Sequence, residues 1–475
     1  MRPPSLTSRA ARLGWVPKEG LRTRDRIRGV KPLGSIFKAY DIRGIYPDDL
    51  DEEVARRVGS AFADFTGAPK IIVGTDCRLS SPSLSAAFSE GVTARGIDVV
   101  EIGLATTDML YFASGRLDLP GAMFTASHNP PAWNGMKLCR EGAAPVGEDS
   151  GLMDVRDLAE QGSLPSSAVS GRVTKQDMLE DYVDHVVSFI DADAMAPLTV
   201  VADGANGMAG LVLPQIAERL PIKLVGLYLD LDGTFPNHPA DPIQPENQKD
   251  LRRAVLEHGA DVGLAFDGDA DRVFVVDEQA EGVSGSLITA LVAEAMLERE
   301  PGGKVLHNVI CSWVVPEVIR ENGGEPIRTR VGHSLIKKIM AETGAIFGGE
   351  HSGHYYFRDH YRADSGLIAA LIVLERLSQS GGTMSDLLAP YRRYHASGEI
   401  NSTVKDQDAA IDRLAASYAD GRQDRLDGLT AEYEDWWFNV RASNTEPLLR
   451  LNVEAKTEAL LEDRTRELLA LIREG

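Results

Sequence analysis

The 475-residue sequence predicts an α/β fold: three similar α/β domains with mixed, mostly parallel sheets, followed by a smaller C-terminal α+β domain. Two observations predict it. A unit of apolar strand, turn, amphipathic helix and second strand occurs three times, and strands that alternate with helices form mostly parallel sheets. The C-terminal part departs from this order. The length agrees with several domains, because a chain of this size is too long for one ordinary core.

Each of the three copies contains a strand, a helix and a second strand, joined by turns that carry Gly or Pro. The copies match in pattern more than in residues, so they suggest three domains of similar build. The expected elements are Lys70–Gly74, Pro82–Ala94 and Ile97–Ile102 in the first copy, Thr199–Ala202, Leu211–Leu220 and Ile222–Leu227 in the second, and Lys304–Ile310, Val315–Glu321 and Pro326–Arg330 in the third.

The two ends of the chain differ from these copies. Near the C-terminus, a helix at Asp408–Ala419 precedes strands at Trp436–Arg441 and Leu448–Ala455 and a closing helix at Glu458–Arg473. Residues 1–34 are rich in Arg and have little apolar periodicity, so they predict a flexible basic extension. The expected domains are residues 35–176, 177–280, 281–390 and 391–475.

Composition excludes several classes of function. The formal net charge of −21 argues against a nucleic-acid partner, since phosphate backbones need clustered Lys and Arg. It does not exclude a phosphorylated substrate, because screening over about 8 Å leaves a pocket's own cations dominant. No apolar run approaches the roughly 20 residues of a membrane span, and the longest, Ser286–Leu297, predicts an amphipathic helix. The separated Cys77, Cys139 and Cys311 predict reduced thiols in a cytoplasmic protein.

The first candidate motif is Thr125–Pro131, which follows the apolar run Gly121–Phe124. Ser127 stands at a strand end before two prolines, which predicts a rigid, exposed turn. The following segment, Asn134–Lys137, can fold a cation back toward it. A serine hydroxyl needs activation to act as a nucleophile, and the Gly-x-Ser-x-Gly elbow of serine hydrolases is absent. An ordinary turn serine is the alternative.

The second motif is Asp267, Asp269 and Asp271, directly after the apolar run Asp261–Phe266. Three carboxylates at alternate positions of an extended chain point to one side and need a cation between them, and oxygen ligands favour Mg²⁺ or Ca²⁺. An EF-hand is excluded because Arg272 stands where Gly is required. An aspartyl-phosphate phosphatase, with Asp267 as nucleophile and Asp269 as acid, is a sharper alternative. Asp271 then stands where such sites usually carry Thr or Val.

Three further segments offer ligands for polar groups. In Gly348–His354, glycines allow close backbone approach, and Glu350, Ser352 and His354 can hydrogen-bond sugar hydroxyls. Upstream, Gly332-His333-Ser334 precedes a helix predicted at Leu335–Thr343. In Arg441–Pro447, between two strands, backbone N–H groups, short polar side chains and an Arg can form an anion-binding nest. An early loop, Tyr40–Gly44, offers Arg43. Each could instead be an ordinary polar turn.

Together these segments resemble the α-D-phosphohexomutase family, and within it bacterial phosphomannomutase/phosphoglucomutase. They occur in that family's order over roughly residues 35–475. The resemblance implies four domains around a central cleft, a phosphoserine at Ser127, and Mg²⁺ held by Asp267, Asp269, Asp271 and that phosphoserine. It implies hexose phosphates as small-molecule substrates, with a hexose 1,6-bisphosphate as intermediate and activator.

The resemblance also implies roles for the other motif residues. Catalytic roles fall to Arg43, His128, Lys137, Arg272 and His333, with proton transfer open between Lys137 and His333. Substrate binding falls to Tyr40, Glu350, Ser352, His354, Arg441, Ser443, Asn444 and Thr445. One departure is Ile310 and Trp313, where family members often place basic residues.

These implications favour a phosphohexomutase acting on mannose, and also on glucose, phosphates. The Glu350-His351-Ser352 version of the sugar loop looks more like mannose-type than glucosamine-type relatives. A phosphoglucosamine mutase, a phosphatase using Asp267, and a catalytically silent sugar-phosphate-binding protein are the alternatives. The expected assembly is a monomer or dimer, with no nucleic acid or membrane partner.

Overall fold

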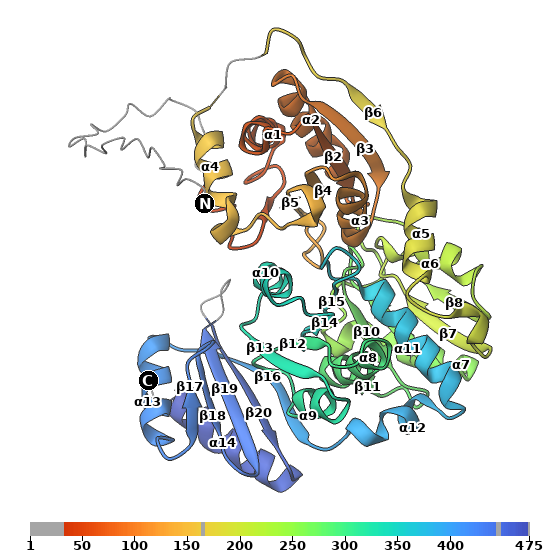
Figure 1. Cartoon of the computed structure of the whole chain (residues 1–475). Coiled ribbons are helices and arrows are strands. Elements are labelled where there is room, and N and C mark those ends of the chain that lie inside the picture. Colours follow the sequence, from red (N-terminus) through yellow and green to blue (C-terminus); the bar gives the residue numbers. More distant parts are fainter. Residues whose placement is uncertain (1–32, 163–166, 443–447, 474–475) are drawn as a thin grey trace, which may run out of the picture.

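The computed structural model describes residues 33–162, 167–442 and 448–473, which form four sheets in chain order. Figure 1 shows the first sheet at the top, the second at the right, the third in the centre and the fourth at the lower left. We call the units built on these sheets domains I to IV. The predicted fold class is confirmed, while the predicted domain boundaries stay predictions.

Domain I contains a six-stranded sheet in the order β1-β5-β4-β2-β3-β6. The β2, β3, β4 and β6 neighbours pair in parallel, and β5 pairs antiparallel with β4 and with β1. The strands are β1 (Ile42–Ile45), β2 (Lys70–Thr75), β3 (Asp98–Leu104), β4 (Gly121–Phe124), β5 (Trp133–Cys139) and β6 (Val173–Lys175). The helices are α1 (Glu52–Thr66), α2 (Ser81–Ala94), α3 (Thr107–Leu117) and α4 (Leu152–Glu160).

Domains II and III repeat this plan with fewer strands, in the orders β11-β10-β9-β7-β8 and β13-β12-β14-β15. Domain II has β7 (Leu198–Asp203), β8 (Ile222–Leu227), β9 (Val262–Phe266), β10 (Val273–Val276) and β11 (Gly282–Val283), with α5 (Leu179–Val187), α6 (Ala209–Ala217) and α7 (Lys249–His258). Domain III has β12 (Lys304–Asn308), β13 (Glu325–Thr329), β14 (Phe347–Gly349) and β15 (Tyr355–Phe357), with α8 (Gly285–Arg299), α9 (Val314–Glu321), α10 (His333–Thr343), α11 (Gly366–Ser380) and α12 (Met384–Leu388).

Domain IV is a fully antiparallel sheet in the order β16-β20-β19-β18-β17. Its strands are β16 (His395–Thr403), β17 (Arg422–Asp424), β18 (Leu429–Glu432), β19 (Trp436–Ala442) and β20 (Leu448–Ala455), with helices α13 (Gln407–Ser417) and α14 (Glu458–Arg473). The strands and helices predicted from the sequence are all present in the expected order. The largest difference is at α6, expected at Leu211–Leu220 and found at Ala209–Ala217.

Three of the motifs lie in the turns of antiparallel hairpins. The β4–β5 turn carries Ser127, the β9–β10 turn carries the three aspartates, and the β14–β15 turn carries Glu350. Arg441 lies at the end of β19, which pairs antiparallel with β20. In domains I to III these turns stand where parallel pairing gives way to antiparallel pairing, so one strand arrangement presents a functional loop three times.

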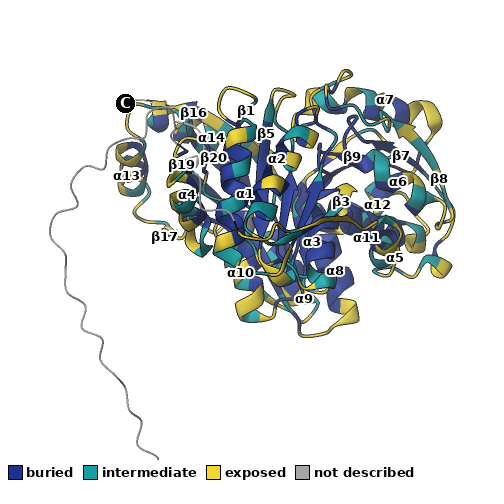
Figure 2. Cartoon of the chain, turned by 90° about the horizontal axis from the view of Figure 1, so that it is seen from above, coloured by how far each residue is buried: buried dark blue, intermediate teal, exposed yellow. Residues whose placement is uncertain are grey.

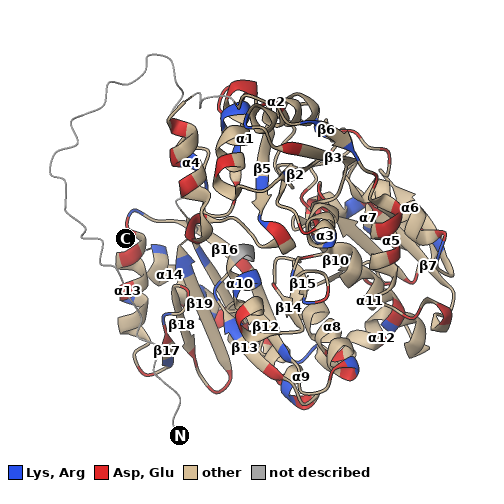
Figure 3. Cartoon of the chain, turned by 45° about the horizontal axis from the view of Figure 1, so that its top comes forward, with Lys and Arg blue, Asp and Glu red and all other residues tan. Residues whose placement is uncertain are grey.

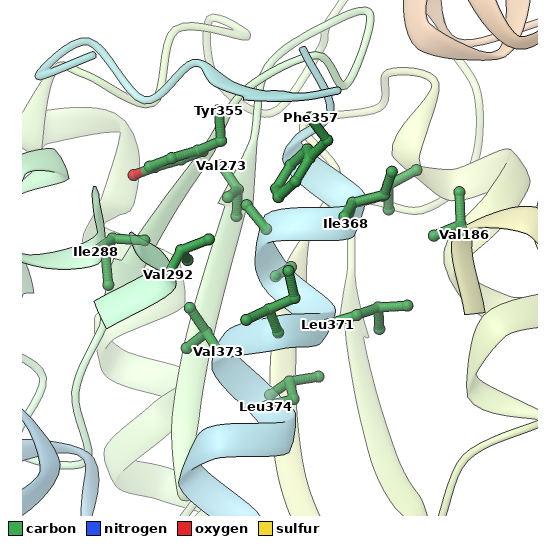
Figure 4. Packing of buried hydrophobic residues seen from close by; sticks show 14 of the residues in the cluster. Val186, Val273, Ile288, Val292, Tyr355, Phe357, Ile368, Leu371, Val373 and Leu374 are labelled. Atoms are coloured by element: carbon green, nitrogen blue, oxygen red, sulfur yellow. The ribbon is translucent and has the colours of Figure 1, made fainter. Parts of the chain in front are cut away.

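Most of the buried apolar residues of domains II and III, together with one face of domain I, form one continuous cluster, whereas domain IV has a separate core. Figure 4 shows helix α11 inside the shared cluster, with Ile368, Leu371 and Leu374 packed between Val186 of α5 and Val292 of α8. Figure 2 shows the same arrangement from above, with buried residues in the strands and inner helices and exposed ones on the periphery.

Helix α8 corrects one prediction. The segment Ser286–Leu297 was expected to form an amphipathic helix, but nearly all of its residues are buried within the shared core. A helix that is apolar all round is typical of the interior of a large protein. No helix in the described part of the chain has the length and apolar character needed to cross a membrane. The three cysteines are free thiols.

Candidate active site

Ser127 lies in the β4–β5 turn with its backbone in the left-handed region, at φ 49°. For a residue other than Gly this conformation costs about 1–3 kcal/mol, so the surrounding structure must hold it. The Ser127 N–H donates to Thr125 Oγ1 at 2.9 Å. Ser127 is only 3% exposed, so the prediction of an exposed turn is wrong in this arrangement. The reason is that domain II covers the turn.

A buried arginine that sequence reasoning missed holds this turn together. The Arg78 guanidinium donates to four backbone carbonyls, those of Ser127 (2.8 Å), Asn129 (2.7 Å), Pro130 (2.8 Å) and Trp133 (3.0 Å). Its charge is balanced by Asp76, 3.1 Å away. Arg78 is 1% exposed. A guanidinium suits this role because its five donors form a fixed fork.

The three aspartates of domain II converge, but not by the route predicted. Residues 267–272 form a turn, with Ala270 at φ 62°, and not an extended chain with alternating side chains. Carboxylate oxygens of Asp267, Asp269 and Asp271 nevertheless lie within 4.8 Å of one another. Gly268 makes the approach of domain I possible, since a Cβ there would lie 2.4 Å from the Ser127 carbonyl oxygen.

Ser127 and the three aspartates meet directly across the domain I–II boundary. Ser127 Oγ donates to Asp267 Oδ2 at 2.7 Å, although the residues are 140 positions apart. Arg272 contacts both, because its Nη2 donates to Ser127 Oγ and its Nε donates to Asp267 Oδ2, each at 2.9 Å. The serine hydroxyl, a carboxylate and a guanidinium are therefore in mutual contact.

Lys137 and Thr107 of domain I hold the other two carboxylates. Lys137 Nζ lies 2.9 Å from Asp269 and 2.5 Å from Asp271, and Thr107 Oγ1 donates to Asp269 at 2.6 Å. Burial opposes ionisation of Asp269, but Lys137 and the Thr107 hydrogen bond outweigh it, so the pKa of Asp269 is lowered. Burial and the neighbouring carboxylates raise the pKa of Asp267 in spite of Arg272. The proton affinity of Asp267 is therefore raised, and that of Asp269 is lowered.

The carboxylate cluster fits a divalent cation. Asp269 Oδ1 and Asp271 Oδ1 are buried and accept no hydrogen bond from any described residue. Leaving such an oxygen unpaired costs roughly 1–3 kcal/mol, and more for a charged group. A hard cation with oxygen ligands, such as Mg²⁺, would satisfy both atoms. Three carboxylates also exceed the two positive charges of Lys137 and Arg272, which leaves negative charge for a metal to neutralise.

Two further predicted residues border Ser127. Arg43 donates to Asp41 at 2.8 Å and to Asn129 Oδ1 at 2.7 Å, which places it beside the serine turn. His128 Nδ1 lies 3.3 Å from Ser127 Oγ and is in hydrogen-bond contact with Arg272. The positive charge of Arg272, together with burial, lowers the pKa of His128 well below its usual value. His128 is therefore neutral here and accepts a hydrogen bond from Arg272.

The β14–β15 turn brings the predicted sugar-binding residues to the same region. His354 pairs with Arg272 through an isolated backbone bridge, and its Nδ1 lies 2.8 Å from Asp364 and 3.9 Å from Asp271. Glu350 is buried and accepts hydrogen bonds from Tyr356, Asn308 and the Gly332 N–H at 2.7, 3.2 and 3.3 Å. Ser352 lies half-buried in the same turn.

Tyr40 and His333 sit where domains I and III face each other. The Tyr40 hydroxyl lies 2.5 Å from where a Cβ on Gly332 would stand, directly before α10. Helix α10 begins at His333, two residues earlier than predicted. The His333 side chain lies outside the described residues, so its orientation stays a prediction.

Only part of the predicted phosphate-binding segment is described. Arg441, at the end of β19, is buried and its Nη2 donates to Glu399 Oε2 at 2.8 Å. Burial lowers the pKa of Arg441, although Glu399 opposes that shift. Its Nε has no partner among the described residues. Ser443, Asn444 and Thr445 lie outside the described residues.

Ile310 and Trp313 are the two residues that depart from the family's pattern of basic residues. They lie between domains III and IV. Ile310 is buried, the Trp313 N–H donates to Glu454 Oε1 at 2.9 Å, and the Trp313 ring meets Tyr394 edge-on, with 5.5 Å between ring centroids. Glu454 also accepts from Trp437 Nε1 at 2.9 Å. The Trp313 N–H and Glu454 thus connect domains III and IV at a place where the resemblance implies basic residues in other family members.

Four profiles of one family match almost the whole described chain. They are described as phosphoglucomutase/phosphomannomutase alpha/beta/alpha domain I over residues 34–161, domain II over 180–282, domain III over 284–394 and the C-terminal domain over 399–471. The chain belongs to the phosphoglucomutase/phosphomannomutase family. The resemblance inferred from the motifs is thereby confirmed.

Individual members of the phosphoglucomutase/phosphomannomutase family are similar over their full length. A phosphomannomutase of Salmonella montevideo is 42% identical over 448 residues, which covers 92% of this chain and 98% of the relative. The phosphohexose mutases of Xanthomonas campestris pv. campestris are 43% identical over 446 residues, with 92% and 99% covered. A crystal structure of a family protein from Burkholderia thailandensis superposes with a TM-score of 0.85 at 35% identity, covering 93% and 98%.

Proposed function

We propose that this chain is a phosphohexomutase that transfers a phosphoryl group between the 1 and 6 positions of a hexose through Ser127. The observation that carries the proposal is the 2.7 Å contact between Ser127 Oγ and Asp267, across the boundary of two domains. Membership of a mutase family supports it. Ser127 comes from the β4–β5 turn, the carboxylates and Arg272 come from the β9–β10 turn, and Lys137 comes from strand β5. The contacts among these groups support the proposal.

The positions of the residues suggest a separate role for each in the reaction. Phosphorylated Ser127 donates its phosphoryl group to a free sugar hydroxyl: the bond from Ser127 Oγ to phosphorus breaks, and a bond from the hydroxyl oxygen to phosphorus forms. The hydroxyl proton passes to a base, for which the candidates are His333 and Lys137, the latter only after it has given up its own proton. The hexose 1,6-bisphosphate then turns over, and its other phosphoryl group returns to Ser127. Arg272, which touches Ser127 Oγ, is placed to stabilise charge on the transferring group.

A divalent cation, for which Mg²⁺ is our proposal, would be held by Asp267, Asp269, Asp271 and the phosphoserine. It would supply Lewis-acid stabilisation of the charge on the transferring phosphoryl group. A phosphoserine carries about −1.5 to −2 charge at neutral pH, so it adds repulsion to a site with three carboxylates. Arg43, Lys137 and Arg272 are the cations of this chain that offset that charge.

The proposed substrates are mannose phosphates first and glucose phosphates second. The names of the similar relatives, phosphomannomutase and phosphohexose mutases, support this order. The proposed sugar contacts are Glu350, Ser352 and His354, with Arg441 and the following turn at the distal phosphate. A side-by-side assay with mannose, glucose and glucosamine 1-phosphates, with Mg²⁺ and a trace of bisphosphate, should give the highest kcat/KM for mannose 1-phosphate.

The decisive experiment removes the hydroxyl. We expect Ser127→Ala to lose at least about 10³-fold in kcat, because no covalent phosphoenzyme can form. Wild-type protein incubated with ³²P-labelled hexose bisphosphate should carry label on serine, and the variant should not. Ser83→Ala, which changes a half-buried serine of α2 whose hydroxyl donates to the Ser80 carbonyl, is the matched control and should keep full turnover. Label on Asp267 instead would favour the aspartyl-phosphate alternative and refute the mutase mechanism.

A further inference from the structure

A cavity of about 700 Å³ lies between domains I and III, on the far side of Lys337 from the carboxylate cluster. We call it the second cavity, to distinguish it from the proposed catalytic site. It is lined by the turn that follows β5, by one face of α10 and by the loop that contains Tyr361 and Arg362. Figure 1 shows α10 at this position, facing domain I from below. Tyr40, a proposed substrate-binding residue, also borders this cavity. The volume is within the usual range for a small-molecule site.

The cavity is positively charged although the protein is strongly acidic. Five cationic residues line it, against the carboxylates of Glu148 and Asp149. Lys337 is paired with Asp364. The other four are Arg140 from domain I and Arg330, Lys338 and Arg362 from domain III. None of the four forms an ion pair with a described residue, whereas most other Arg and Lys side chains of the described chain do. Figure 3 shows acidic residues on peripheral helices such as α4, α5 and α9. Like charges gathered without partners suggest an anionic ligand.

The loop that presents Arg362 is strained and firmly held. Tyr361 and Arg362 are consecutive residues in the left-handed region, at φ 53° and 63°. Each costs about 1–3 kcal/mol in a residue other than Gly, and such outliers persist only where the surroundings impose them. The Tyr361 ring imposes it here by packing on Gly115 of α3, where a Cβ would lie 2.2 Å from the ring. The Arg362 N–H also donates to the Phe357 carbonyl at 3.0 Å.

A wall of paired groups separates this cavity from the proposed catalytic site. The Lys337 stem lines the cavity, but its ammonium lies 2.7 Å from Asp364 and over the Tyr111 ring. Asp364 in turn accepts from His354, which faces Asp271. Asp364 therefore balances the charge of Lys337. The other four cations, Arg140, Arg330, Lys338 and Arg362, line the cavity without an ion-pair partner among the described residues.

We propose that this cavity binds a small molecule that carries at least two phosphate groups, at a site separate from the one that binds the hexose phosphate. Two or more phosphates match four cations, of which three are guanidinium groups suited to bidentate contacts. Arg140 comes from domain I and the other three from domain III, so the ligand bridges the two domains and stabilises their present arrangement. The proposal does not depend on the mutase activity, since it concerns binding alone.

The test is a calorimetric titration of the full chain, without added divalent cation, with pyrophosphate and separately with ADP. We expect two binding sites on the wild-type protein. The double variant Arg330→Ala/Arg362→Ala should lose one of them, with an affinity loss of at least tenfold, and should keep mutase turnover. Arg441→Ala should lose the other site. Lys338→Glu, on an exposed position of α10, provides an independent variant with the same expected loss.

A control variant, a check of folding and the comparison of two ligands decide between the possible outcomes. Arg358→Ala is the matched control, because Arg358 lies on the same loop but is paired with Glu300 and Asp359 outside the cavity. Circular dichroism melting verifies that each variant is folded. Tighter binding of ADP than of pyrophosphate would show that a nucleoside adds contacts, and equal binding that the phosphates alone are recognised. A single pyrophosphate site that is lost in Arg441→Ala and unchanged in Lys338→Glu and the double variant would overturn the proposal.

Discussion

The two ends of the proposed active site are built in different ways. At the chemical end, Ser127, Arg272 and the three aspartates are buried, hydrogen-bonded to one another and carried by domains whose apolar cores are joined. At the phosphate-binding end, Arg441 belongs to domain IV, which has a core of its own, and its guanidinium is occupied by Glu399. The chemical end is therefore pre-organised, whereas the binding end must exchange a partner to receive a substrate phosphate.

This difference has a physical reason. Phosphoryl transfer depends on placement of the reacting groups, and a displacement of about 1 Å can cost on the order of 100-fold in rate. A site that must accept phosphate from either end of a sugar gains from a loosely attached domain that can adjust. The variants below are ordered by the size of the effect that this comparison predicts.

The largest effect should come from the arginine behind the serine turn. Arg78→Lys keeps the charge but loses the fork that binds four carbonyls, so the left-handed turn at Ser127 should relax. We expect kcat to fall about 100-fold with little change in KM, because a misplaced nucleophile impairs transfer and not substrate binding. Steady-state kinetics on hexose 1-phosphate, with melting temperature as a fold check, measures this.

The control for Arg78 is another buried arginine of the same domain. Arg57 is 6% exposed and donates to the Ala159 carbonyl, away from the serine turn. Arg57→Lys should lower the melting temperature without changing kcat. Equal kcat values in Arg78→Lys and wild type would mean that the turn is held by other contacts.

The chemical end also shows where sequence reasoning stops. The strands and helices could be predicted, because apolar periodicity and Gly or Pro turns are local signals. The motif residues could be found because polar groups such as Ser127 and Asp267 follow buried strands. Their convergence through two tight turns, with φ near 50–60° at Ser127 and Ala270, could not be read from the pattern, which suggested an exposed turn and an extended chain.

Other features carried no local signal at all. Arg78 stands in the segment Asp76–Ser81, where its four carbonyl partners are about fifty residues away in sequence. The unpaired cations of the second cavity come from two domains and become neighbours only after folding. The all-round burial of α8 likewise depends on α11 and the strands that enclose it, so its sequence alone resembled a surface helix.

A smaller effect is expected at the binding end. Arg441→Ala removes a charged donor for the distal phosphate, and such hydrogen bonds contribute about 1.5–3 kcal/mol, so KM should rise roughly 10- to 100-fold. At saturating substrate kcat should change less, since the groups around Ser127 are untouched. Glu399→Gln is the complementary variant: it removes the negative charge that pairs with Arg441, so the hydrogen bond weakens and KM should fall by a few-fold. A fall in kcat with unchanged KM in Arg441→Ala would place this residue at the chemical end instead.

The smallest effect concerns how domain IV is attached. Glu454 is buried between domains III and IV, and burial raises its pKa in spite of hydrogen bonds from Ser312, Trp313 and Trp437. A carboxyl group whose pKa is raised on folding binds its proton more tightly in the folded state, so its ionisation weakens the fold. The penalty is present above the folded-state pKa and is relieved as pH falls through that value toward the unfolded value of about 4.3.

Glu454→Gln should therefore remove part of the pH dependence of stability while keeping an oxygen acceptor for Trp313 and Trp437. Measured as melting temperature at pH 5 and pH 7, the wild type should lose more stability than the variant on going to pH 7, by roughly 2 °C or less. All other titrating groups are common to the two proteins and cancel in the comparison. Identical pH profiles would mean that Glu454 is not strained by its burial, and that other contacts between domains III and IV, such as the ion pairs of Arg328 with Asp424 and Glu432, determine how firmly domain IV is held.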